Sequence, residues 1–103
     1  MIIVTTETIT GRNCVQLGIV TGNVVKSKNF VKDFGAGMKS IIGGELVSYT
    51  KMLVEAREIA TERMIAEAEK MGADAIVNVR FSSSTITQGA AEILASGTAV
   101  KFE

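Results

Sequence analysis

The stretch LVSYTKMLVEAREIATERMIAEAEKM, Leu46–Met71, decides the fold of this chain. Its apolar residues recur three or four positions apart, which places them on one side of an α-helix. Gly72 follows, where a helix commonly ends in a left-handed turn. The sequence therefore predicts one long amphipathic helix, and its apolar side comprises Tyr49, Met52, Leu53, Ala56, Ile59, Ala60, Met64, Ala68 and Met71.

Two strands are predicted after the helix. In Ala75–Ser82 apolar and polar residues alternate, as in a strand with one buried face. Ala91–Phe102 has apolar residues at both parities, which is typical of a central strand covered on both sides. The serines at 82–84 and the segment Thr87–Gly89 are interpreted as the turn between the strands.

Before the helix, Ile2–Thr5 is a short β-prone segment and Val15–Lys26 a longer one. In the longer segment Val15, Leu17, Ile19 and Val25 fall on one parity, and Gly18, Val20, Gly22 and Val24 fall on the other. A turn at residues 21–23 and a continuous strand fit equally well. Residues 29–42 predict one or two short helical turns, and Gly43-Gly44 then separates them from the long helix.

The fold class that follows is α+β: a single domain, residues 1–103, with an antiparallel sheet packed on one long helix in two layers. One helix covers one face of a small sheet. Because 47% of the residues are hydrophobic, the other face needs a cover too. We expect sister subunits to provide it, so that the protein is a homo-oligomer.

The composition argues against several other classes of protein. Eleven basic residues balance eleven acidic ones, so no overall positive field favours nucleic acid as a partner. The sequence has no run of about 18 apolar residues, so it predicts no membrane span, and the N-terminus lacks the pattern of a signal peptide. With Cys14 as the single cysteine, no disulfide can form within the chain. A cytoplasmic location is expected.

Cys14 is also a candidate metal ligand, although a weak one. The chain has no histidine, and a zinc-type site needs three or four Cys, His or carboxylate ligands. One thiolate per chain meets that need only by clustering around a symmetry axis, so a buried or incidental thiol is the simpler interpretation.

Several motifs, in this order, resemble the YbjQ family of small bacterial and archaeal proteins. They span nearly the whole chain: Gly18–Gly22, Asp33–Gly37, Gly43–Tyr49, Leu53–Ala60, Met71–Val77 and Gly97–Val100. The resemblance implies a dodecin-subunit-like fold that assembles as a five-fold ring, with extra short strands helping the association. It also implies a family described as heavy-metal-binding, although its biochemical role is uncharacterised, and it assigns no residue here as a metal ligand.

Gly43, Gly44, Tyr49 and Arg57 are shared motif positions and are interpreted as interface or ligand residues. Tyr49 and Arg57 lie about two helical turns apart on the same side. The first hypothesis is a non-enzymatic homo-oligomer, a pentamer or a multiple of one, that binds a metal ion or small ligand at its subunit interfaces. The alternatives are an enzyme with an active site shared between subunits, and a ring that binds nucleic acid through the basic residues of 26–39.

Overall fold

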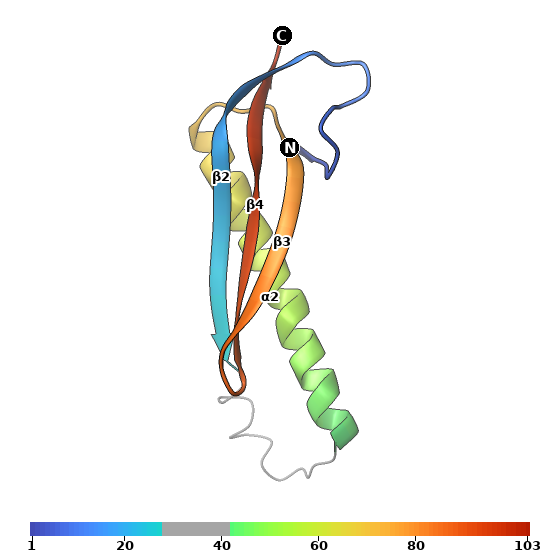
Figure 1. Cartoon of the computed structure of the whole chain (residues 1–103), viewed down its shortest axis with the longest axis vertical. Coiled ribbons are helices and arrows are strands. Elements are labelled where there is room, and N and C mark those ends of the chain that lie inside the picture. Colours follow the sequence, from blue (N-terminus) through green and yellow to red (C-terminus); the bar gives the residue numbers. More distant parts are fainter. Residues whose placement is uncertain (28–41) are drawn as a thin grey trace.

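The computed structural model describes residues 1–27 and 42–103, and the side chains of 42–46 are outside that description. The described elements are β1 (Ile2–Ile3), β2 (Cys14–Ser27), α2 (Ile42–Lys70), β3 (Ala75–Thr87) and β4 (Ala90–Phe102). The strands form one sheet in the order β1-β3-β4-β2, and α2 runs along one side of it (Figure 1). The α+β class is therefore confirmed.

The sheet is mixed, and the prediction of a purely antiparallel sheet was wrong. Strands β2, β3 and β4 pair antiparallel, but β1 runs parallel to β3, with Ile2 opposite Ala75 and Ile3 opposite Ile76. The chain beyond β1 stays beside β3, because the amide of Val79 donates to the carbonyl of Val4 at 3.0 Å. A segment this short gives no pattern from which its direction can be predicted.

The helix is longer than its apolar pattern indicates. It begins at Ile42, so Gly43 and Gly44 lie in its first turn and do not precede it. The conformational entropy that glycine loses costs most in the middle of a helix, so two glycines in the first turn are tolerated. The C-terminal prediction is confirmed: Gly72 has a φ of 77°, and its amide donates to the carbonyl of Glu69 at 3.0 Å. The helical turns predicted for residues 29–42 lie, except for Ile42, outside the described residues.

Strand β2 is continuous, without a turn at residues 21–23. Its two parities face opposite ways, as the sequence indicates. Val20, Gly22 and Val24 are buried on the helix side of the sheet. Ile19 and Val25 are exposed on the opposite face, and Val15 and Leu17 are exposed as well, although the alternation of faces reverses between Gln16 and Gly18. A register shift between Gln16 and Gly18 marks a bulge.

Strand β3 continues to Thr87, so the serines predicted as turn material belong to the strand. They pair with β4, with Ser82 opposite Leu94 and Ser84 opposite Glu92. The turn is confined to Gln88 and Gly89, where Gly89 has a φ of 80°. The predicted central position of β4 is confirmed, since β3 and β2 pair on either side of it.

The main core lies between α2 and the sheet. The helix buries a side chain at every fourth position: Met52, Ala56, Ala60, Met64 and Ala68. Their partners from the sheet are also apolar: Val20, Val24, Ile76, Val79, Ile93, Ala95 and Ala99. The predicted apolar side is confirmed at its centre, whereas Tyr49, Leu53 and Ile59 are half-buried at its margins and Met71 is exposed.

A second, smaller core lies at the end of the sheet that holds the termini. Ala75, Val77 and Val100 are buried there, and partly buried side chains pack against them: Val4, Ile9, Cys14 and Phe102. Val77 and Val100 are on the opposite parity from the residues that face α2. The N-terminal segment therefore covers one end of the face that the helix leaves open, which the sequence did not predict.

Asp74 fastens this end of the sheet. Its carboxylate accepts a hydrogen bond from the Phe102 amide at 2.8 Å and another from Lys101 Nζ at 3.4 Å. The Phe102 hydrogen bond lowers the pKa of Asp74 below its ordinary value of 3.8, and Lys101 lowers it further. Because the folded state lowers this pKa, the stabilisation is complete above 3.8 and is lost as the pH falls through the lowered value.

Asp74→Asn is therefore expected to be less stable than the wild type at pH 7 and to approach it in strongly acidic solution, where the carboxyl is protonated in both states. Urea unfolding at a series of pH values measures the difference. Glu58→Gln, on the exposed side of α2, is the control and should show no such convergence. A gap between Asp74→Asn and the wild type that is constant with pH would contradict this assignment.

Candidate functional site

The structure contains a hollow of about 710 Å³ beside the second core. Its base is apolar, formed by Val77 and Val100, and its rim is mostly polar. The polar side chains come from the N-terminal segment, the start of β2, the strands β3 and β4, and the last residue; they are Glu7, Thr8, Arg12, Asn13, Cys14, Gln16, Asn78, Thr98 and Glu103.

Local geometry fixes two of these residues. The guanidinium of Arg12 lies over the ring of Phe102, 4.4 Å from its centroid. Asn78 has a φ of 53°, which asparagine tolerates better than most residues, and its amide donates to the carbonyl of Thr6 at 2.9 Å. The backbone of Asn78 thus ties β3 to the N-terminal segment, and its half-buried side chain lines the hollow.

Cys14 is the first residue of β2; its side chain is half-buried, and its thiol forms no disulfide. It packs against the second core and lines the hollow. Over residues 1–27 and 42–103, no three Cys, Asp or Glu side chains lie close enough together to hold a metal ion. A metal at Cys14 would therefore need ligands from other subunits or from the part of the chain outside this description.

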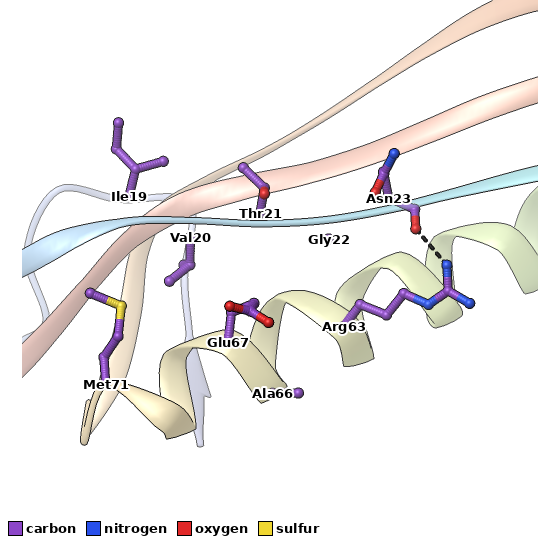
Figure 2. A pocket seen from close by; sticks show the side chains of 9 residues that line it. All are labelled: Ile19, Val20, Thr21, Gly22, Asn23, Arg63, Ala66, Glu67 and Met71. Atoms are coloured by element: carbon purple, nitrogen blue, oxygen red, sulfur yellow. Dashed lines mark hydrogen bonds between the residues drawn. The ribbon is translucent and has the colours of Figure 1, made fainter.

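A second hollow, which we call the β2–α2 groove, lies between the edge of β2 and the C-terminal half of the helix (Figure 2). It has a volume of about 460 Å³ and is lined by Ile19, Val20, Thr21, Gly22, Asn23, Arg63, Ala66, Glu67 and Met71. Arg63 extends from α2 and donates from Nη1 to the carbonyl of Asn23 at 2.7 Å, as the dashed line in Figure 2 shows. One end of the groove is apolar, at Val20 and Met71, and the other is polar.

The residues predicted for an interface or ligand site line neither hollow. Gly43 and Gly44 are in the first turn of α2, Tyr49 is half-buried, and Arg57 is exposed, with its carbonyl accepting from Thr61 Oγ1 at 2.8 Å. The helix begins at the end of the molecule opposite the termini (Figure 1). The structure therefore does not bring these residues together with Cys14.

Apart from Cys14, the sequence analysis did not single out the polar side chains that shape the two hollows. Arg63 and Asn23 are forty positions apart and belong to no motif. Asn78 offered the best local signal, since it is an asparagine within an otherwise regular strand pattern and asparagine is enriched at positive φ.

The 29-residue helix α2 contains too many charged residues to cross a membrane, and the part of the chain that the structure describes holds no other candidate span.

Comparisons with known proteins agree along the full length of the chain. The UPF0145 protein of Thermosipho africanus (strain TCF52B) is 61% identical over 104 residues, which is all of this chain and 96% of that protein. The UPF0145 protein of Vibrio campbellii (strain ATCC BAA-1116) is 56% identical over 103 residues, covering 99% of each chain.

A crystal structure of a protein of unknown function from the DUF74 family, from Pediococcus pentosaceus ATCC 25745, has a TM-score of 0.59. It is 12% identical, and the match covers all of this chain and 98% of that one, so it supports the fold alone. The model of the YbjQ family, described as "Putative heavy-metal-binding", matches residues 1–103. The chain therefore belongs to the YbjQ family, whose curated relatives are named UPF0145.

Proposed function

We propose that this protein is the subunit of a homo-oligomeric ring, a pentamer or a multiple of one, that binds a metal ion or small ligand where subunits meet. The observation that supports it best is the presence of large exposed apolar side chains on β2. Ile19 is 80% exposed and Val25 56%, and both lie on the sheet face away from α2. Large apolar side chains exposed on the open face of a sheet favour an interaction site there.

The shape of the subunit also supports assembly. Its radius of gyration is 17.1 Å, whereas a compact domain of this length has about 13 Å. The molecule measures 56 × 22 × 18 Å, so it is a long, thin two-layer unit. Such a unit buries little apolar surface by itself, and association with further copies adds the second cover that its sheet lacks.

The polar hollow beside Cys14 is where a ligand would bind in this proposal. It opens on the sheet face away from α2, the face to which the exposed side chains of Ile19 and Val25 also belong. A sister subunit covering that face would close the hollow and contribute side chains to it. Because Cys14 lacks further metal ligands nearby in its own chain, as far as the structure describes it, a metal there depends on that contribution.

Native mass spectrometry of protein purified without a histidine tag tests the proposal. We expect a closed oligomer, and we expect Ile19→Lys to shift it to monomers because the new charge would be buried against a sister subunit. Thr50→Lys, an exposed helix position with the same change in charge, should leave the oligomer intact.

The same spectra report any retained ligand as added mass. A metal bound at Cys14 would disappear in Cys14→Ser while the number of subunits stayed the same. A folded wild-type monomer at micromolar concentration would contradict the proposal.

A further inference from the structure

We propose that the β2–α2 groove receives part of β3, residues Phe81–Thr87, from a second copy of the chain, an inference that rests on the ring proposed above. The incoming strand would extend the sheet at the edge of β2, and Phe81 of the second copy would enter the groove beside Gly22.

The first observation is the edge of β2. It is the outermost strand of the sheet, and from Cys14 to Val25 it has no charged residue and no proline, the devices that usually protect an edge from pairing. The Asn23 carbonyl accepts from Arg63 and therefore points away from β4. Since peptide groups alternate along a strand, those of Thr21 and Ile19 point the same way and can pair with another strand.

The second observation is a matching edge on β3. The N-terminal segment borders β3 only as far as Arg80, whose Nη1 donates to the carbonyl of Thr5 at 2.9 Å. From Phe81 to Thr87 the outer edge of β3 pairs with no described strand, and all seven residues are exposed and uncharged. Among the described residues the sheet thus has two edges that pair with no further strand, on its opposite sides, and Arg63 occupies only the Asn23 carbonyl of the β2 edge.

The registers of the sheet place these two edges opposite each other in a ring. Phe81 pairs with Ala95, and Ala95 pairs with Gly22, so Phe81 and Gly22 lie at the same level of the sheet. Rotation about an axis parallel to the strands keeps that level. The second copy's Phe81 would then arrive beside Gly22, within the stretch of β2 that lines the groove.

The face of the sheet on which Phe81 lies also fits the groove. Ala95 is buried on the helix side, and Phe81, its direct neighbour, shares that side and is 47% exposed. In a closed ring every helix lies on the same side of the joined sheets. The second copy's Phe81 would therefore point toward α2 of its neighbour, where Arg63 lies beside Gly22 in the groove (Figure 2).

Pairing of β2 with β2 of a second copy is the main alternative. It would make a two-fold dimer and would leave the Phe81–Thr87 edge open in both copies. Pairing of β2 with β3 covers both edges of every subunit, and it generates a ring from one repeated contact.

Disulfide trapping tests the contact. Asn23 and Ser82 both pair with Leu94, so they lie level and on the same face. Within one chain β4 separates them by two strand spacings, about 9–10 Å, which is too far for a disulfide. Between copies paired as proposed they would be direct neighbours. Asn23→Cys combined with Ser82→Cys, in a Cys14→Ser background, should give a ladder of covalent multimers on oxidation.

Each single cysteine variant in the same background should give no ladder. A covalent dimer from Asn23→Cys alone would overturn the proposal in favour of β2–β2 pairing. The absence of a ladder from an oligomer that native mass spectrometry shows to be intact would overturn this contact and leave the ring standing. A monomer in native spectra of the untagged wild type would overturn the ring itself.

A second variant tests the role of Phe81 in the contact. Phe81→Ala should raise the concentration at which the oligomer dissociates by about tenfold or more, because a large aromatic side chain would no longer be buried in the contact. Ser83→Ala, two residues further on the same side of β3, should change it less than about twofold. Equal effects of the two variants would overturn the role of Phe81.

Discussion

Gly22→Ala is expected to abolish or severely weaken folding, although it adds a single methyl group. Gly22 is buried in β2 where the strand passes closest to the helix. A Cβ there would overlap the Ala60 carbonyl oxygen and the Met64 amide nitrogen, and it would lie 2.9 Å from Arg63 Cβ. Because the overlapping atoms belong to helix backbone, no side-chain rotation relieves the contact, and the helix would have to move away from the sheet.

Overpacking a core typically costs about 1–3 kcal/mol, and a clash with backbone on this scale should reach or exceed the upper limit. That is a large part of the roughly 5–15 kcal/mol by which a domain is stable. Urea or thermal unfolding followed by circular dichroism measures the loss. Thr21→Ala, the exposed neighbour in the same strand, is the control and should stay within about 0.5–1 kcal/mol of the wild type. A Gly22→Ala protein with wild-type stability would mean that the helix does not pack this closely.

The buried faces of the helix and of β2, which meet at Gly22, could be predicted from the sequence. Small residues at 56, 60 and 68 of the helix and at 18 and 22 of β2 share the periodicity of the large ones, so the pattern identified the buried faces correctly. A burial pattern depends on one element at a time, with a period of 3.6 or 2 residues. The helix face, the two parities of β2 and the central position of β4 are properties of that kind.

Features that depend on two elements could not be predicted. Ser82–Ser84 favour turns locally, but pairing with β4 satisfies their backbone groups and keeps them in the strand. The direction of β1 depends on where the N-terminal segment crosses the sheet, which two residues do not encode.

The candidate site could not be predicted for the same reason. Gly43, Gly44, Tyr49 and Arg57 were selected because they are motif positions, and the structure distributes them along the first half of α2. The groove instead depends on Arg63 meeting Asn23, and the polar hollow on the N-terminal segment folding over β3 and β4. These contacts join distant parts of the chain and follow no sequence spacing.

Met64→Ala should produce the second large loss of stability, for the opposite reason from Gly22→Ala, because it removes volume and leaves a cavity. Met64 is fully buried and is among the largest of the fully buried side chains, packed between α2 and the sheet with Ile76 and Ala99 in the same core cluster. Truncating a buried methionine typically costs about 2–5 kcal/mol, since the lost burial adds to the cost of the cavity. The neighbours that could collapse into the space are mostly alanines and short β-branched residues, which favours the upper half of that range.

Met71→Ala is the matched control, because it makes the same chemical change one residue beyond the end of α2, where the side chain is 41% exposed. It should cost less than about 1 kcal/mol. The ligand-free subunit and its assembly can both be followed, since native mass spectrometry reports oligomers while urea unfolding reports stability. If Met64→Ala and Met71→Ala lost equal stability, the core would not lie between the helix and the sheet. The exposed apolar side chains of β2 would then no longer be evidence that the sheet needs a sister subunit to cover its second face.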